Sequence, residues 1–193
     1  MDVIERVRSG VLGHFGADRT GVDSASVTFL GLEPIEILRL VAGEYVHYLT
    51  LGGSRHPMGD PNDLLADPVR GPRAELTLTL HAGLGAATGL ARTLGVLAAS
   101  PAVEGVILRA DALLDLSEPI WRGAPFTAVL LGASDIPEVE LDEPAEPVHY
   151  LTVTPVTATE AAWVRLRGAE ALREAWAEAG IDVRDPNRGV AQL

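Results

Sequence analysis

The sequence of 193 residues contains no cysteine and no lysine, and aromatic residues make up only 5% of it. Without cysteine the chain has no disulfide framework, no thiolate zinc site and no thiol nucleophile. Without lysine it lacks the P-loop lysine, a Schiff-base lysine and the catalytic lysine of kinases. Because aromatic residues are scarce, we expect an aliphatic core, and the length is sufficient for one domain.

Positive charge is also scarce, since 15 basic residues stand against 27 acidic ones and give a net charge of −12. Such a surface repels phosphate backbones and anionic membranes, so we expect neither nucleic acid nor a membrane as a partner. The first ten residues include Asp2 and Glu5 and lack an apolar segment, which argues against a signal peptide. We therefore expect a cytoplasmic protein.

The hydrophobic pattern predicts an α+β single domain over 1–193, with a central mixed, largely antiparallel sheet packed by helices. A helix is expected within residues 1–18, ending near Gly16. A T-x-x-E capping box at Thr157 and Glu160 indicates a C-terminal helix that breaks at Gly168. The other expected elements are strands at 26–30, 35–42, 45–51, 75–80, 103–109, 126–131 and 148–154, and a helix at 86–99.

The pentapeptide VHYLT occurs twice, at 46–50 and at 148–152. In the first copy His47 shares a strand face with Leu49 and Leu51, whereas His149 in the second shares one with Leu151 and Val153. The two histidines therefore have different neighbours, which argues against a metal site shared by the two copies. No histidine has HxH or HExxH spacing, so we predict no metal site.

Three glycines between 83 and 89 follow a strand and precede a helix, with a spacing one residue longer than that of a dinucleotide-binding loop. The preceding ELTLTL segment, 75–80, alternates leucine with polar residues, as a half-exposed strand does. The first strand of a dinucleotide-binding fold is instead apolar on both faces. A small enzyme that binds a nucleotide or phosphate at Gly83–Gly89 is the alternative hypothesis, and we assign no catalytic residue and no cofactor.

Two polar segments stand out in the otherwise aliphatic sequence: a loop rich in glycine and proline at 52–74, and an acidic stretch at 135–147 with six acids. Functional residues concentrate in loops that a rigid scaffold carries. The residues expected to bind a partner are Ser54, Arg55, Asp60 and Asp67 in the loop, and Glu138, Glu140, Asp142 and Glu143 in the acidic stretch. At the C-terminus, RDPNRG is expected to fold back on the sheet, with Arg188 bonded to carbonyl groups or a carboxylate; a frayed tail is the alternative.

Five motifs in this order make residues 25–190 resemble the suppressor of fused domain family. They are VHYLTLGGS (46–54), AELTLTL (74–80), GLARTLGVLA (89–98), VHYLTVTPVTATEAAW (148–163) and IDVRDPNRG (181–189). Asp67, Gly71 and Glu75 also keep a spacing similar to that of the family's partner-contacting loop. The family's Trp-Pro pair before the Leu-Ala-Arg helix is missing here. The two VHYLT copies take different places in the family pattern, so the resemblance implies two separate core strands and not a duplicated site.

The resemblance implies a non-enzymatic protein-binding domain. The founding animal member binds and restrains zinc-finger transcription factors, and bacterial single-domain relatives are thought to serve as immunity proteins that neutralise toxins. We therefore expect a bacterial immunity protein or regulatory adaptor. Its partner would be another protein, such as a basic toxin domain that the acidic surface attracts.

Overall fold

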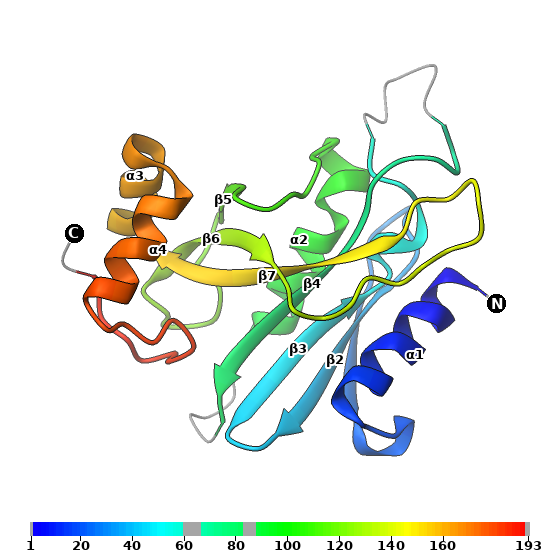
Figure 1. The fold of residues 1–193 in the computed structure, drawn as a ribbon, viewed down its shortest axis with the longest axis horizontal. Coiled ribbons are helices and arrows are strands. Elements are labelled where there is room, and N and C mark those ends of the chain that lie inside the picture. Colours follow the sequence, from blue (N-terminus) through cyan, green and yellow to red (C-terminus); the bar gives the residue numbers. More distant parts are fainter. Residues whose placement is uncertain (1, 60–66, 83–87, 192–193) are drawn as a thin grey trace.

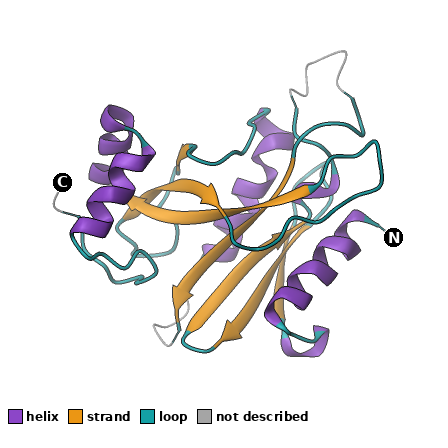
Figure 2. Ribbon diagram, in the orientation of Figure 1, coloured by secondary structure: helices purple, strands orange, loops and turns teal. Residues whose placement is uncertain are grey.

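The computed structural model describes residues 2–59, 67–82 and 88–191 (Figures 1 and 2). In chain order the helices and strands are α1 (Val3–Phe15), the short 3-10 helix η1 (Arg19–Gly21), β1 (Asp23–Val27), β2 (Ile35–Ala42), β3 (Tyr45–Leu51), the 3-10 helix η2 (Gly53–Arg55), β4 (Arg73–His81), α2 (Leu90–Glu104), β5 (Leu113–Asp115), β6 (Phe126–Ala133), β7 (Val148–Thr157), α3 (Ala158–Arg167) and α4 (Ala169–Glu178). The strands form one sheet in the order β1-β2-β3-β4-β7-β6-β5. Within the described chain β4 and β7 are parallel and the other neighbouring pairs antiparallel, which confirms the predicted α+β fold.

The N-terminal elements form largely where the sequence predicted them. α1 ends at Gly16, whose φ of 59° lies in the left-handed region that favours glycine. Gly43 has φ 60° in the tight turn between β2 and β3, as the first central residue of a type II′ turn requires. The strand expected at 26–30 instead spans Asp23–Val27. The chain turns after Phe29, whose carbonyl accepts a hydrogen bond from the N–H of Leu32, and so leaves the sheet early.

The region after β4 corrects two predictions. The helix expected at 86–99 begins at Leu90 and continues to Glu104, and the residues expected to form a strand at 103–109 form none. The helix ends where Gly105 adopts φ 70°, and residues 105–109 belong to no strand of the described sheet. Leu108 is instead buried beside Met58, whose sulfur accepts a hydrogen bond from its backbone N–H.

β4 is more deeply buried than a half-exposed strand. Its polar face was expected to meet solvent, yet Glu75 is 0% exposed and Thr77 only 5% exposed. The short helix η2 packs on the beginning of β4, so a loop covers the face that alternation left polar. The sequence prediction also missed β5, a strand of three residues that pairs with β6.

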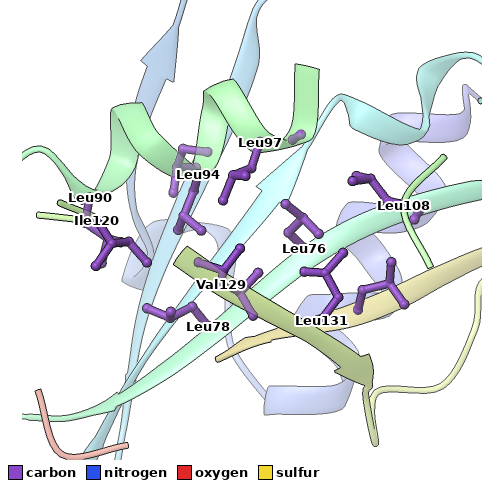
Figure 3. Close-up of a cluster of buried hydrophobic side chains, with 14 of the residues drawn as sticks. Leu76, Leu78, Leu90, Leu94, Leu97, Leu108, Ile120, Val129 and Leu131 are labelled. Atoms are coloured by element: carbon purple, nitrogen blue, oxygen red, sulfur yellow. The ribbon is translucent and has the colours of Figure 1, made fainter. Parts of the chain in front are cut away.

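Three apolar clusters hold the described elements together. One lies between the sheet and α2, where Leu90, Leu94 and Leu97 pack against Leu76 and Leu78 (Figure 3). On the opposite face, α1 packs over β2, β3 and the beginning of β7, and α3 with α4 packs over β6 and the end of β7. Figure 1 shows α1 and the α3–α4 pair over opposite ends of the sheet.

The two VHYLT segments lie in β3 and β7 and face opposite ways. In β3, Leu49 packs under α1, whereas Tyr48 packs towards α2. In β7, Tyr150 packs under α1 and its hydroxyl donates to the carbonyl of Val7, whereas Leu151 packs towards α2. The same pentapeptide therefore presents opposite sets of side chains to α1 in the two strands, and the segments do not form a duplicated site.

The C-terminal segment is anchored and not frayed. The capping box forms as predicted, because the N–H of Glu160 donates to the Thr157 hydroxyl and the Glu160 carboxylate accepts from the N–H of Thr157. Gly168 separates α3 from α4. Arg188 lies in the core, where its guanidinium donates to both oxygens of Glu160 and to the carbonyl of Pro155. Among the described residues no helix has the length and apolar character to cross a membrane.

Candidate partner-binding site

The carboxylate of Glu75 holds the loop that follows β3. Its Oε1 accepts hydrogen bonds from the N–H of Gly52 at 2.8 Å, the N–H of Ser54 at 2.9 Å and the Ser54 hydroxyl at 2.6 Å. Its Oε2 accepts from the hydroxyl of Thr50 at 2.6 Å. Burial raises the pKa of Glu75 above its ordinary value, although these hydrogen bonds favour the charged form. One buried carboxylate therefore accepts four hydrogen bonds from the end of β3 and the turn that follows it.

Arg73 lies two residues earlier on the same face of β4 and holds the carbonyl groups of the same loop. Its Nη1 donates to the carbonyl oxygens of Ser54 and Arg55, each at 2.8 Å, and its Nη2 donates to that of Val69 at 3.1 Å. Arg73 is 4% exposed, and burial lowers its pKa, but a guanidinium stays charged. Residues on both sides of 60–66 are thus fixed to the beginning of β4.

Two glycines let this loop approach the sheet and α2. Gly52 has φ 134°, and a Cβ there would lie 3.1 Å from the carbonyl oxygen of Pro34. A Cβ at Gly53 would lie 3.3 Å from the carbonyl oxygens of both Ala74 and Ala98. The Gly-Gly-Ser sequence therefore supplies close contact at its first two positions and a hydrogen-bonding side chain at its third.

A groove of about 570 Å³ lies beside the loop, within the size range of ligand sites. It is lined by residues from four segments: 31–35, 52–59, 67–70 and the end of α2 at 98–102. Apolar atoms come from Ile35, Met58 and Ala98. Charged and titratable groups of both signs line it as well: Glu33, Asp67, Arg55, His56 and Arg70.

Part of this charge is already paired within the protein. The Oε2 of Glu33 lies 3.0 Å from Nε of Arg55 and 3.3 Å from Nε2 of His56. Oδ1 of Asp67 accepts from the backbone N–H groups of Arg70 and Val69, and these bonds lower the pKa of that carboxyl. The guanidinium of Arg70 forms no ion pair with any described residue, so it is available to a partner.

The structure divides the four loop residues that the sequence singled out. Arg55 and Asp67 line the groove. Ser54 is 0% exposed and its hydroxyl is bound to Glu75, so it shapes the loop and presents no surface to a partner. Asp60 lies outside the described residues.

The acidic stretch approaches the same end of the sheet as the loop. Because β4 and β7 are parallel, with Arg73 opposite Val148, the segments that precede the two strands meet there. Figure 1 shows the yellow chain before β7 beside the chain that leads into β4. Val139 forms an antiparallel bridge with Val148 and fixes the stretch against the beginning of β7.

The four acids expected to bind a partner differ in their surroundings, although all are exposed. Oε2 of Glu138 lies 3.0 Å from Nδ1 of His149, and Asp142 forms an ion pair with Arg6 of α1. The other two side chains form no ion pair with any residue in the described ranges: Glu140 and Glu143. Of the four acids expected to bind a partner, these two carry unpaired negative charge.

Sequence reasoning missed several groove residues, including Glu33, Met58 and the end of α2. For Glu33 the sequence did hold a signal. If 35–42 and 45–51 pair as antiparallel strands, the residues before the first strand lie beside those after the second. Glu36 indeed pairs with Leu51. The approach of α2 depends on three-dimensional packing and had no signal of this kind.

The alternative nucleotide site at Gly83–Gly89 cannot be placed, because residues 83–87 lie outside the described residues. Gly89 is described and precedes α2 with φ 94°. Within the described ranges, His, Asp and Glu side chains form no group of three that would hold a metal ion.

Comparisons with known proteins give one family. The family model described as "Suppressor of fused protein (SUFU)" matches residues 31–189. A solved SUFU homologue from Neisseria gonorrhoeae FA 1090 superposes with a TM-score of 0.70 at 18% identity, covering 98% of this chain and 97% of the homologue.

Two further solved structures share the fold. The match to a chain of the Sufu–Fu complex has a TM-score of 0.68 at 12% identity and covers 97% of this chain and 91% of the other. The match to Drosophila Suppressor of Fused has a TM-score of 0.64 at 11% identity and covers 98% of this chain but only 50% of the fly protein. No curated protein matches the chain.

Proposed function

The chain belongs to the suppressor of fused family, and on that premise we propose that it acts by binding another protein and not by catalysis. The observation that carries this proposal is the groove beside the 52–56 loop. Two buried ionic side chains, Glu75 and Arg73, fix its wall, while Arg70 at its rim has no ion-pair partner in the described chain. A rigid wall with an unpaired charged group at the rim is suited to recognition, because little order is lost on binding.

The partner that we propose is a basic protein, such as a toxin domain that this chain neutralises. Three features support this choice: the net charge of −12, the exposed and unpaired Glu140 and Glu143, and their position at the same end of the sheet as the groove. Long-range attraction would bring a basic partner to this end of the molecule, and contacts in the groove would then hold it.

The groove is tested by capture of a partner from the native host with tagged wild-type protein and two variants. Arg70→Ala removes an exposed guanidinium that forms no ion pair with a described residue. Asp67→Asn removes a charge but keeps an oxygen that accepts the two backbone hydrogen bonds. Both variants should dissociate from the partner faster than wild type, by about tenfold if each loses a charged contact.

Arg92→Ala is the matched control for the groove variants, because Arg92 is an exposed arginine of α2 that does not line the groove. It should bind like wild type. Equal dissociation of the wild type and both groove variants from a captured partner would contradict binding in the groove.

Electrostatic attraction is tested separately through the association rate. Glu140→Gln with Glu143→Gln leaves the ion pairs of Glu138 and Asp142 intact. This double variant should associate more slowly at low salt, and the difference should shrink as salt is added, because screening acts over about 8 Å at physiological ionic strength. The control is Glu174→Gln with Glu178→Gln, which changes the net charge equally on exposed positions of α4.

Equal association rates for the two double variants would refute attraction by the acidic stretch and leave the groove proposal untouched. Capture of an acidic partner would refute the basic-toxin proposal. Strong thermal stabilisation by a nucleotide, about 2.7 kcal/mol at 100 times its Kd, would instead favour the enzyme alternative.

A further inference from the structure

The sheet face opposite α2 carries a polar strip between two helix-covered clusters. Along β7, alternate residues share a face. Val148 and Tyr150 pack under α1, and Val156 packs under α3 and α4. Thr152 and Thr154 lie between them on the same face. The sequence thus interrupts an apolar strand face with two hydroxyls at the place where the helices on this face leave the sheet uncovered (Figure 1).

The neighbouring strands extend this strip. Thr77 of β4 pairs in register with Thr152 of β7, and Thr79 of β4 pairs with His47 of β3. These strands form the floor of a hollow of about 320 Å³. Its walls come from the end of α1, the segment after β6 and the C-terminal segment: His14, Phe15, Ser134, Asp135, Ile136, Val183 and Arg184.

The floor offers hydroxyl groups that the protein does not fully use. Thr79 shares a hydrogen bond of 2.9 Å with Nδ1 of His47. Thr77 lines the hollow and is 5% exposed, yet its hydroxyl forms no hydrogen bond within the described chain. Thr154 has no side-chain hydrogen bond there either. Because these hydroxyls bond to no described residue, they are open to hydrogen bonds with a ligand that carries hydroxyl groups of its own.

The walls are nearly balanced in charge and partly aromatic. Asp135 and Arg184 contribute one charge of each sign, and the guanidinium of Arg184 lies 4.5 Å above the ring of Tyr45. Burial holds the pKa of His47 below its ordinary value; nearby His14 lowers it further and Asp135 opposes them, so the ring is neutral at pH 7. The ring of Phe15 lies 4.5 Å from that of His47. Such walls do not select a charged ligand.

We propose that this hollow binds a neutral polyhydroxylated small molecule of the size of one sugar ring. The threonines of β4 and β7 would exchange hydrogen bonds with its hydroxyl groups, and its apolar face would lie against Phe15 or Tyr45. A hollow of 320 Å³ is at the small end of ligand sites, which suits one ring better than a longer chain. The site is separate from the groove, and no residue of the groove lines it.

The proposal is tested by ligand-observed NMR with glucose, galactose, mannose and N-acetylglucosamine, each raised to millimolar concentration. Inorganic phosphate and glycine serve as an anionic and a zwitterionic probe of similar or smaller size. Saturable binding of at least one sugar, without binding of phosphate or glycine, supports the proposal. Binding of none of the sugars, or of phosphate or glycine alone, overturns it.

Two isosteric variants place the binding on the floor. Thr77→Val keeps the β-branched shape and removes the unpartnered hydroxyl, so the bound sugar should lose about tenfold in affinity. Thr127→Val changes a threonine of β6 that does not line the hollow and should bind like wild type. If Thr77→Val lowers the melting temperature, sugar affinity is measured instead with Thr154→Val, which removes a floor hydroxyl at a less buried position. Equal affinity of the floor variants and Thr127→Val would place the sugar elsewhere and overturn the proposal.

Discussion

Arg188→Ala should be among the most destabilising single substitutions in this protein. The guanidinium of Arg188 donates to Glu160 at 2.6 and 3.0 Å and to the Pro155 carbonyl at 2.8 Å, and it lies over the rings of Phe126 and Trp176. The side chain of Glu160 is 0% exposed. Removing its partner leaves a buried charge, which costs about 3–5 kcal/mol. For a chain of this length that corresponds to a fall in Tm of roughly 6–20 °C.

The assay is thermal and urea unfolding of wild type, Arg188→Ala and a matched control. Arg165→Ala breaks an ion pair in which Nη2 contacts both carboxylate oxygens of Asp115. Its side chains are 51% and 69% exposed, so the loss should cost no more than about 1 kcal/mol. A double variant that adds Glu160→Gln to Arg188→Ala should recover part of the loss, because the buried charge is gone.

The loss should also depend on pH in a defined direction. Burial would raise the pKa of Glu160, but hydrogen bonds from Arg188, Thr157 and Trp176 outweigh it and leave the pKa below its ordinary value. Because its folded-state pKa is lowered, Glu160 contributes to the free energy of unfolding above about pH 4.3. This contribution is lost as pH falls through the folded-state pKa. The gap in stability between wild type and Arg188→Ala should therefore be largest near neutral pH and shrink in acid.

Two results would refute this reasoning. If Arg188→Ala unfolds within about 0.5 kcal/mol of wild type, as a typical surface change does, the C-terminal segment is not anchored as described. If the gap grows as pH falls, the unpaired carboxylate is not the source of the loss.

Substitutions at three other positions test the scaffold of the groove and the fold. Glu75→Ala should destabilise by about 3 kcal/mol or more in urea unfolding, because several buried donors lose their acceptor, whereas Glu75→Gln keeps one oxygen and should cost much less. Because burial raises the pKa of Glu75, that residue's contribution is most favourable in acid and declines as pH rises above about 4.3. Gly95→Ala should cost about 1–3 kcal/mol, since its Cβ would lie 2.8 Å from Cβ of Val27 and force α2 from β1. Thr157→Ala should cost about 0.5–2 kcal/mol through loss of the helix cap, measured by the same unfolding curves. A Glu75→Ala or Gly95→Ala variant with an unchanged unfolding midpoint would contradict the packing described.

Local chemistry explains the elements that the sequence predicted well. The capping box at Thr157 and the helix end at Gly16 each depend on residues within four positions, so their signals are complete in a short window. The strand expected at 103–109 failed for the opposite reason. Its residues favour extended structure, but a strand needs a neighbouring strand to pair with, and the pairings of the described sheet do not include these residues.

In the candidate site, too, local sequence located some residues, whereas contacts between distant segments decided what others do. Sequence analysis selected Arg55 and Asp67 because they stand in a long polar loop, and both line the groove. It also selected Ser54 as a contact, although a fully buried hydroxyl bonded to Glu75 positions the loop instead. The partner of Ser54 is 21 residues away, and a hydrogen bond over that distance depends on how β3 and β4 pair.

By itself, the sequence determined that the core is aliphatic and the surface acidic, and where most helices and strands form, because composition and periodicity act through neighbouring residues. Only the tertiary structure decided which faces those elements bury. It covered the polar face of β4 with a loop, brought the loop and the acidic stretch to one end of the sheet through parallel pairing, and placed Arg188 against Glu160. Each of these outcomes depends on contacts between residues distant in sequence, whose geometry exists only once the whole sheet has formed.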